Sequence, residues 1–245
     1  MGLAFPPSLS PSSVSAFKSC PLAFKFSYID RLPEPPSAAA TKGTLVHRAL
    51  ELLMCRPEPD RTVDAALVDL ETAGVEMADD PDLAGLELKL TAQFGRVKLR
   101  GIIDRLEIDD DGEFVVTDYK TGSVPSEFAE NARLSGVHIY AALCEQMLGK
   151  RPARVQLYYL SKPEAIIATP TEQSVAGVGR RADAVWTAIL RACERDDFRP
   201  HTGPLCDYCN FKPYCPAFGG DPLQAAELRG PGTMIEPSLP LGVGT

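Results

Sequence analysis

The sequence predicts an α/β protein in which a mixed β-sheet is flanked by helices. Residues 43–53 and 63–77 have helical apolar spacing, residues 88–120 have the pattern of three short strands, and helix and strand patterns alternate after that. Strands separated by helical segments build a sheet whose faces the helices cover. At 245 residues, the chain is long enough for one domain with a substantial core.

The N-terminal part is expected to be helical. Ser10-Pro11-Ser12-Ser13 is typical of a helix start, and we expect this helix to reach Tyr28 with a break or kink at Pro21. The Pro- and Ala-rich residues 32–40 then lead into the helix expected over 43–53. Helices therefore precede the strands in the chain.

Residues 88–120 predict a meander of strands. The turn signal Asp109-Asp110-Asp111-Gly112 lies between two apolar runs, Ile102–Ile108 and Phe114–Thr117, which indicates a hairpin. The remaining expected elements are a helix, two strands and a long helix, over residues 126–148, 154–160, 165–169 and 173–194.

Composition is ordinary for a soluble globular protein, with 44% hydrophobic and 24% charged residues. No apolar run is long enough to span a bilayer, and the N-terminus lacks the basic and apolar regions of a secretion signal. We therefore expect a cytoplasmic protein without a membrane partner. Residues 1–220 are expected to form the domain, and residues 221–245, rich in Pro and Gly, a poorly ordered tail.

The net charge of −8 argues weakly against a nucleic-acid partner, because phosphate binding needs basic side chains. Net charge does not fix the local field, however, and metal ions bound in an acidic site invert it. Charge alone therefore leaves nucleic-acid binding open.

Two acidic residues and a lysine carry the strongest chemical signal. Asp104 lies in the strand before the Asp-rich turn, and Asp118-Tyr119-Lys120 lies in the strand after it. Because successive strand side chains alternate between faces, Asp118 and Lys120 point the same way and Tyr119 points opposite. Such carboxylates hold Mg²⁺ together with substrate phosphate, and a metal with a lysine can orient a water and neutralise charge on a phosphate. The arrangement predicts a nuclease site.

The alternative is that these acids are ordinary charged residues on an exposed strand face. Apolar Ile102 and Ile103 precede Asp104, however, and two valines lie shortly before Asp118. Burying a carboxylate without a partner costs roughly several kcal/mol, which sequences avoid unless a cation or a function compensates. A functional role for both acids is therefore favoured.

Two further residues have both a functional and a structural interpretation. His47 shares a helix face with Glu51, and neutral imidazole is a common metal ligand, although a helical histidine is more often a surface or core residue. Both interpretations of His47 stay open. Tyr140, in the helix expected over 126–148, could stack on a base or contact a phosphate, but core packing is the commoner role of such a tyrosine.

Three of the seven cysteines form a cluster near the end of the expected domain: Cys206, Cys209 and Cys215. In a reducing compartment this spacing indicates metal binding, and both zinc and iron–sulfur centres usually take four ligands. Cys20, which like Cys215 is followed by proline, is one candidate for the fourth ligand. Cys193 and His201 are rivals, and the spacing does not exclude zinc.

Taken together, these motifs resemble the PD-(D/E)XK nuclease superfamily, and within it the RecB-like exonucleases that carry an iron–sulfur cluster. That group includes the nuclease domain of the AddB helicase–nuclease subunit and the CRISPR-associated nucleases of spacer acquisition. The resemblance runs from about Leu9 to Phe218. The motifs that carry it are the Ser-rich segment before Cys20-Pro21, Gly43-x₃-His47, Gly101-x₂-Asp104, Asp118-x-Lys120-Thr121-Gly122 and the three C-terminal cysteines.

The resemblance implies a restriction-endonuclease-like fold with a divalent metal site. Mg²⁺ or Mn²⁺ would be held by His47, Asp104, Asp118 and the main-chain carbonyl of Tyr119. Asp104, Asp118 and Lys120 would be the catalytic residues.

The resemblance also implies a second metal centre, one [4Fe–4S] cluster that fastens the N-terminal helix to the C-terminal segment. Its ligands would be Cys20, Cys206, Cys209 and Cys215. Tyr140 would contact DNA. Where the family has a glutamine before this tyrosine, the chain has Gly136.

The implied activity is hydrolysis of phosphodiester bonds in DNA, by an exonuclease acting on single-stranded DNA or DNA ends. The implied setting is DNA repair, recombination or CRISPR adaptation, with a helicase, repair or CRISPR protein as partner. The alternative is a non-catalytic DNA-binding or scaffolding module whose metal cluster is structural. Intact Asp104, Asp118 and Lys120 argue against this alternative, whereas Gly136 and the acidic charge argue for it.

Overall fold

The chain divides into two units, one that joins residues 1–35 to 182–245 and one that spans residues 36–181. The computed structural model describes residues 3, 5–35, 37–73 and 85–228. We call the two parts the terminal unit and the sheet unit, and each is described by itself.

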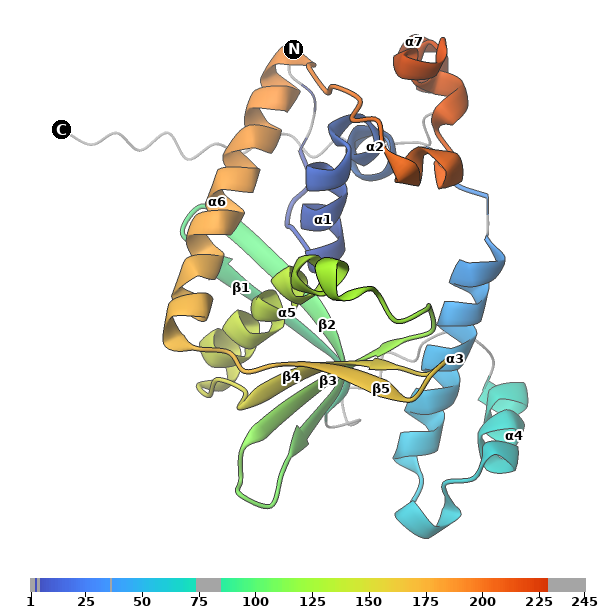
Figure 1. The fold of residues 1–245 in the computed structure, drawn as a ribbon, viewed down its shortest axis with the longest axis vertical. Helices are drawn as coiled ribbons and strands as arrows, with labels where there is room; N and C mark the ends of the chain where they lie inside the picture. Colours follow the sequence, from blue (N-terminus) through green and yellow to red (C-terminus); the bar gives the residue numbers. More distant parts are fainter. Residues whose placement is uncertain (1–2, 4, 36, 74–84, 229–245) are drawn as a thin grey trace, which may run out of the picture. The chain divides into compact units, whose positions relative to one another are not determined.

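The sheet unit is built on a five-stranded sheet in the order β1-β2-β3-β4-β5 (Figure 1). The strands are β1 (Leu86–Phe94), β2 (Val97–Ile108), β3 (Phe114–Lys120), β4 (Arg154–Tyr159) and β5 (Glu164–Ala168). Neighbouring strands are antiparallel except β3 and β4, which are parallel. Parallel neighbours need a long crossover, and helix α5 (Glu127–Leu148) supplies it. The expected mixed sheet with flanking helices is confirmed.

Both hairpins of the meander are closed by glycine-containing turns. Phe94 pairs with Val97 across a two-residue turn whose Gly95 has a φ of 60°, a conformation that glycine adopts at little cost. In the second turn, Asp109 Oδ1 accepts hydrogen bonds from the main-chain N–H groups of Asp111 and Glu113, at 3.2 and 2.9 Å. The carboxylate of Asp109 therefore shapes this turn.

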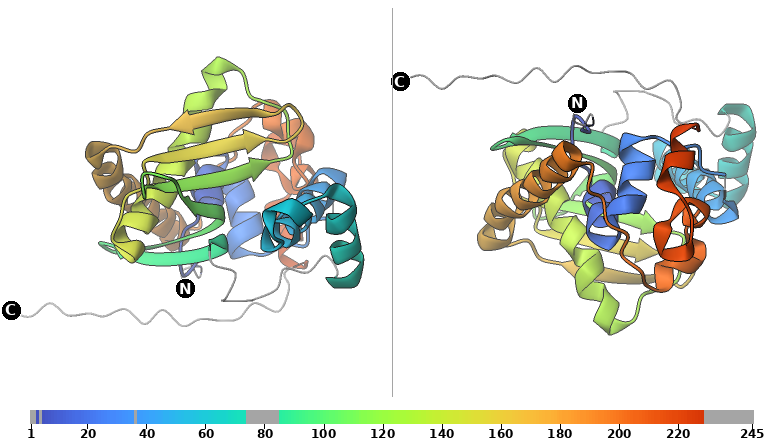
Figure 2. Two further views of the ribbon diagram at one scale, coloured as in Figure 1. Left: turned by 90° about the horizontal axis from the view of Figure 1, so that it is seen from below. Right: turned by 90° about the horizontal axis from the view of Figure 1, so that it is seen from above.

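Helix α5 lies across one face of the sheet and contacts β1, β2, β4 and β5 (Figures 1 and 2). The side chains buried in this unit come mainly from the strands and from the second half of α5. They include Leu90, Val97, Leu99, Ile103, Val116, Val137, Leu143, Val155 and Leu157. This apolar layer fixes the position of α5, and with it the position of every side chain that α5 directs toward the strands.

Two helices precede the sheet in the chain, α3 (Ala38–Cys55) and α4 (Val63–Ala73). The Ser37 hydroxyl caps α3 by accepting a hydrogen bond from the main-chain N–H of Ala40, at 3.1 Å. Arg56, at the end of α3, donates two hydrogen bonds of 2.7 Å to Asp69 of α4, which joins the two helices. The helix expected over 63–77 is confirmed to Ala73, and its remainder lies outside the described residues.

The terminal unit begins with the expected broken helix. Helix α1 (Pro11–Ser19) is followed by α2 (Pro21–Phe24) and a π-helical turn, η1 (Lys25–Ile29). Because Pro21 cannot continue α1, Cys20 stands between the helices in an extended conformation, with φ −157° and ψ 106°. The prediction of a break at Pro21 is confirmed.

Helix α6 (Glu172–Arg195) runs from the sheet unit into the terminal unit and carries Trp186. Cys206 lies in, and Cys209 and Cys215 lie next to, three short 3₁₀ turns: η3 (Pro204–Tyr208), η4 (Lys212–Tyr214) and η5 (Pro216–Phe218). Phe26 of η1 packs against Phe211, with ring centroids 5.3 Å apart. Aromatic packing thus joins the N-terminal helices to the cysteine-bearing turns inside this unit.

The start of the expected tail is helical. Asp221 caps a short helix, α7 (Pro222–Ala226), by accepting a hydrogen bond of 2.8 Å from the main-chain N–H of Leu223. Residues 229–245 lie outside the described residues. Among the described helices, none combines the length and apolar character needed to cross a membrane.

Candidate active site and cysteine pocket

The candidate active site lies where β2 and β3 stop pairing. The last pair of this ladder is Arg105 with Thr117, so Asp104 and Asp118 occupy the next positions on the two strands. Beyond this point the main-chain N–H of Tyr119 donates a hydrogen bond of 2.6 Å to Asp104 Oδ2. The Tyr119 carbonyl oxygen lies 3.1 Å from Nε2 of His47. Asp104 and His47 are therefore the partners of the Tyr119 main chain at the position where β2 no longer pairs with β3.

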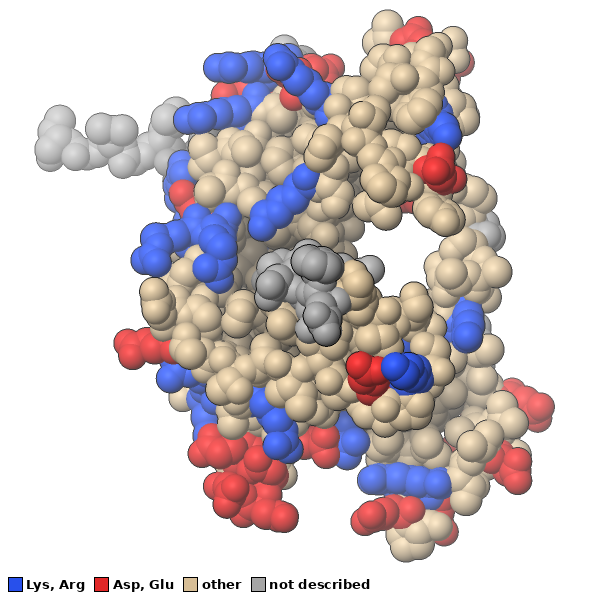
Figure 3. All heavy atoms as spheres, in the orientation of Figure 1, with Lys and Arg blue, Asp and Glu red and all other residues tan. Residues whose placement is uncertain are grey.

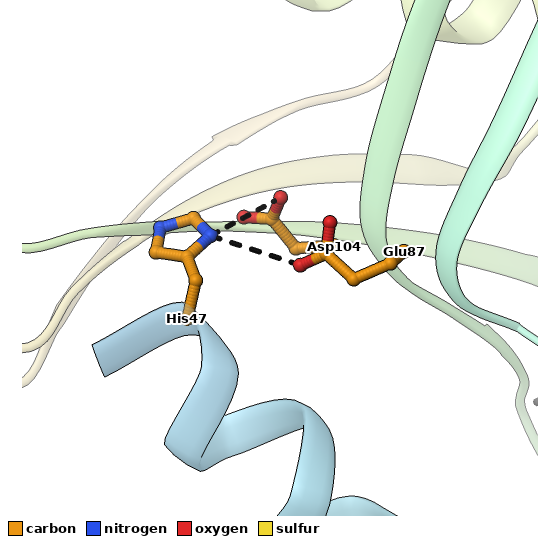
Figure 4. A group of neighbouring side chains, drawn as sticks. All are labelled: His47, Glu87 and Asp104. Atoms are coloured by element: carbon orange, nitrogen blue, oxygen red, sulfur yellow. Dashed lines mark ion pairs between the residues drawn. The ribbon is translucent and has the colours of Figure 1, made fainter. Parts of the chain in front are cut away.

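His47 comes from α3, which contacts the start of the sheet at β1. While Nε2 faces the Tyr119 carbonyl, Nδ1 faces two carboxylates (Figure 4). Nδ1 is 3.6 Å from Asp104 Oδ1 and 3.8 Å from Glu87 Oε1. The ligand atoms of His47, Glu87 and Asp104 all lie within 4.8 Å of one another, which makes these residues a candidate metal site.

Glu87 is the residue of this site that sequence reasoning missed. The first strand was expected to begin at Leu88, whereas β1 begins at Leu86 and includes Glu87. The turn after Phe94 contains the signal that could have found it. In this hairpin, residues at equal distances from the turn face each other, so Glu87 of β1 comes opposite Asp104 of β2.

Asp118 and Lys120 lie on the same side of β3, as the alternation of strand side chains predicts. Lys120 Nζ forms an ion pair with Asp118 Oδ2. The Asp118 side chain is 7% exposed, whereas that of Lys120 is 39% exposed and can reach a bound substrate. Burial raises the pKa of Asp118, the Lys120 charge opposes this shift, and the charge of Asp104 adds to it.

Tyr140 of α5 reaches the same carboxylate from the helix layer. Its hydroxyl donates a hydrogen bond of 3.3 Å to Asp118 Oδ1. The tyrosine ring lies over Gly101 of β2, where an added Cβ would come within 3.0 Å of Tyr140 Cε1 and 2.9 Å of Leu143 Cδ1. The absence of a side chain at Gly101 therefore lets Tyr140 approach the sheet and position Asp118.

The neighbouring carboxylates of Glu87 and Asp104 favour a cation at this site. At an effective dielectric constant near 20, two carboxylates within 4.8 Å repel each other by about 3 kcal/mol or more. Interaction with Asp104, and then with Glu87, raises the pKa of His47 to about 10, although burial opposes the shift. Burial raises the pKa of Glu87 as well. In the metal-free protein the imidazolium therefore serves as the local cation.

The donor set fits a hard divalent cation. Asp118 Oδ2 is buried and has no partner among the described residues beyond the ion pair with Lys120. Carboxylate oxygens with an imidazole suit Mg²⁺ or Mn²⁺. His47 Nδ1 faces Asp104 and Glu87, so this nitrogen is the one that would bind an ion shared with their carboxylates. Of the expected ligands, His47 and Asp104 belong to one group of ligand atoms within 4.8 Å of one another, to which Glu87 adds a third.

Glu51, one turn after His47 on α3, has a structural role in the structure, because it pairs with Arg48 of the same helix. Its Oε2 accepts a hydrogen bond of 2.7 Å from Arg48 Nη1, and both side chains are buried. Its Oε1 has no hydrogen-bond partner among the described residues. The negative charge of Glu51 contributes to the raised pKa of Glu87.

A second candidate site is a pocket in the terminal unit. Among its lining residues are four cysteines, Cys20, Cys206, Cys209 and Cys215. The main-chain N–H of His201 donates to Cys20 Sγ at 3.4 Å, and that of Gly203 donates to Cys206 Sγ at 3.3 Å. Burial raises the pKa of Cys209, and the nearby sulfurs of the other three raise it further. The four cysteines therefore line one pocket.

The rivals for the fourth ligand lie differently. Cys193 is buried in α6 and does not line this pocket, and burial raises the pKa of its thiol to about 11. His201 lines the pocket, but its Nδ1 lies 3.0 Å from the main-chain oxygen of Ser19. Cys20, held extended at the break before Pro21, is the thiol that the fold brings to the C-terminal three.

The family profile described as PD-(D/E)XK nuclease superfamily matches residues 8–82 and 68–216. Among solved structures, a candidate exonuclease from Eubacterium rectale is 13% identical, with 83% of this chain and 87% of that chain covered and a TM-score of 0.51. SSO0001 is 16% identical, with 86% of each chain covered and a TM-score of 0.46. At 13% identity, the likeness to the candidate exonuclease concerns the fold alone. No curated protein matches the sequence.

The raised pKa of His47 predicts how metal affinity depends on pH. Below pH 6.5 the imidazolium contributes its full stabilisation to the metal-free fold, and this contribution is lost as pH rises through about 10. A metal ligand must be neutral, so Mn²⁺ binding at pH 7 displaces a proton. Titration calorimetry should show affinity rising by up to about tenfold per pH unit from pH 6.5 to 8.5. His47→Asn should remove that dependence, and a pH-independent affinity in the unmodified protein would contradict the assignment.

Proposed function

Because the chain belongs to the PD-(D/E)XK nuclease superfamily, we propose that it hydrolyses phosphodiester bonds in DNA with Mg²⁺ or Mn²⁺. The observation that carries this proposal is the meeting of His47, Asp104 and Asp118 around the main chain of Tyr119, with Lys120 beside them. These residues come from α3, β2 and β3, and their convergence gives an oxygen-rich site with an exposed ammonium at its edge.

Each residue has a separate task in the proposed reaction. His47, Asp104, Asp118 and the Tyr119 carbonyl would hold the divalent cation. When bound, this cation supplies Lewis-acid stabilisation of the charge that develops on the phosphodiester. Lys120, held beside Asp118 and partly exposed, neutralises charge on the scissile phosphate and orients the attacking water. Tyr140 keeps Asp118 in place through its hydroxyl.

The distribution of surface charge supports a nucleic-acid substrate better than the net charge does. Helix α6 exposes four arginines, Arg180, Arg181, Arg191 and Arg195, and Figure 3 shows Lys and Arg side chains gathered over this helix. Acidic side chains gather instead at the tip of the β2–β3 hairpin, where Asp110 and Asp111 are exposed. Backbone phosphates are attracted by local basic surface even on an acidic chain.

We further propose that single-stranded DNA or DNA ends are the substrate, and that the protein acts as an exonuclease in repair, recombination or CRISPR adaptation. A helicase or another protein of those pathways would then be its partner. The support is the resemblance of the combined motifs to the RecB-like exonucleases, together with a fold shared with a candidate exonuclease.

We also propose that the cysteine pocket holds one [4Fe–4S] cluster. Four cysteines line one pocket, and the sulfurs of two of them accept main-chain N–H hydrogen bonds, the kind of contact that tunes iron–sulfur centres. Cys20 comes from one end of the chain and the other three come from the opposite end. A cluster would therefore close a very long loop and stabilise the terminal unit.

Cleavage assays test the active site. Anaerobically purified protein should degrade end-labelled single-stranded DNA with Mn²⁺ and should leave it intact with a chelator. Asp118→Asn and Lys120→Ala should each lower the rate about 10²-fold or more, because each removes a group that acts on the phosphate or its metal. Lys150→Ala, which removes a lysine between α5 and β4 that pairs with Glu113 of the hairpin turn, is the matched control and should cleave normally.

Two outcomes would count against the nuclease assignment. Undiminished cleavage in either active-site variant would show that the activity belongs to other residues. A correctly folded protein that binds DNA but cleaves neither single nor double strands would favour the scaffolding alternative, to which Gly136 points.

Metal analysis tests the cysteine pocket. The protein should be brown and contain iron and sulfide in equal amounts, and Cys20→Ser should lose the colour and destabilise the terminal unit. Variants of the three cysteines that do not line the pocket should keep the colour: Cys55→Ser, Cys144→Ser and Cys193→Ser. A colourless protein with stoichiometric zinc would refute the cluster and leave the nuclease site standing.

A further inference from the structure

Glu87 lies opposite Asp104 in the β1–β2 ladder, although it belongs to none of the sequence motifs. The pairs Leu86–Arg105 and Leu88–Ile103 flank these two acids and set them across from each other. Carboxylates at directly opposed positions of an antiparallel pair destabilise a sheet. The side chains of Glu87 and Asp104 are only 15% and 9% exposed, so water screens their repulsion weakly. Such a pair needs a cation between or beside it.

The ladder also sets a third acid beside this pair. Asp118 follows the last β2–β3 pair, and its buried Oδ2 has no hydrogen-bond partner among the described residues beyond the ion pair with Lys120. Glu87, Asp104 and Asp118 therefore belong to three neighbouring strands at one level of the sheet. His47 faces the first two of them, with its Nδ1 within 3.8 Å of each.

The backbone of Glu87 is held in an uncommon conformation. Its φ is 44°, in the left-handed region that residues other than glycine rarely adopt. Two residues earlier, the main-chain oxygen of Gly85 accepts a hydrogen bond from the main-chain N–H of Leu106, which holds this end of β1 on β2. Unfavourable backbone conformations of this kind persist mainly where the position of a side chain matters for function.

We propose that Glu87 is a further ligand of the divalent cation. Three carboxylates and an imidazole then hold the ion, where the sequence motifs provide only two carboxylates. The inference rests on the proposed metal-dependent function, but it concerns binding of the ion and not the cleavage step. Added negative oxygen donors strengthen the binding of hard cations and offset the mutual repulsion of the acids.

Calorimetric titration of the full-length protein with Mn²⁺ tests this role. Glu87→Gln keeps the shape of the side chain and removes its charge, so it should weaken Mn²⁺ binding by about tenfold or more. Glu113→Gln, which removes a partly exposed acid at the β2–β3 turn, should bind Mn²⁺ like the unmodified protein. Circular dichroism should show that both variants are folded. If Glu87→Gln does not fold, Glu87→Asp, which keeps the charge on a shorter side chain, should fold and still bind more weakly.

Glu87→Asp separates direct ligation from a simple loss of charge. It keeps the negative charge near the ion on a side chain one methylene shorter, and salt is no substitute for this variant because the largely buried Glu87 is screened weakly. A tenfold deficit of Glu87→Gln that Glu87→Asp shares supports ligation. A deficit confined to Glu87→Gln, or Mn²⁺ binding of Glu87→Gln within threefold of the unmodified protein, overturns it.

Failure of this inference is distinguishable from failure of the proposed function. An unmodified protein that binds Mn²⁺ but does not cleave DNA would refute the nuclease proposal, while the titration of Glu87→Gln would still decide the role of Glu87. A protein that cleaves DNA and whose Glu87→Gln variant binds Mn²⁺ normally would keep its function and lose this ligand.

Discussion

The separation of β2 from β3 beyond the Arg105–Thr117 pair is the constraint on which the rest of the site depends. Where the ladder ends, the main-chain groups of Tyr119 need new partners, and Asp104 and His47 provide them. That exchange draws a carboxylate and an imidazole to the position where Asp118 lies buried. Helix α3 must then pack at the start of the sheet, and the first residues of β1 must bring Glu87 beside His47 and Asp104. The local charge that results is stable only with a cation.

The parts of this arrangement that depend on periodicity and turn chemistry could be predicted from the sequence. The alternation along β3 placed Asp118 and Lys120 together, and their ion pair confirms it. The Asp-rich turn indicated the hairpin that carries Asp104 to the adjacent strand. The proline after Cys20 marked the end of α1, where the structure has an extended residue. Each of these signals acts within a few residues of chain.

Other parts depend on contacts between distant segments, which a local pattern cannot encode. Glu87 joins the site only because the register of β1 on β2 sets it opposite Asp104. The sequence pattern predicts that this strand begins at Leu88, so Glu87 falls just outside the predicted strand. The hydrogen bond from Tyr140 to Asp118 depends on the space left by Gly101, and the spacing of residues in the sequence does not reveal that space. The choice of Cys20 over Cys193 depends on which thiol lines the pocket. The division of the chain into two units joins its two ends and leaves no compositional mark.

The most direct test of the central claim, that these carboxylates and His47 hold one divalent cation, is anomalous X-ray diffraction from crystals soaked in Mn²⁺. A manganese peak should lie between His47, Asp104 and Asp118, next to the carbonyl of Tyr119 and within ligand distance of Glu87. An empty site at saturating Mn²⁺, with His47 still bonded to the Tyr119 carbonyl, would contradict it. So would a manganese peak found only elsewhere on the protein.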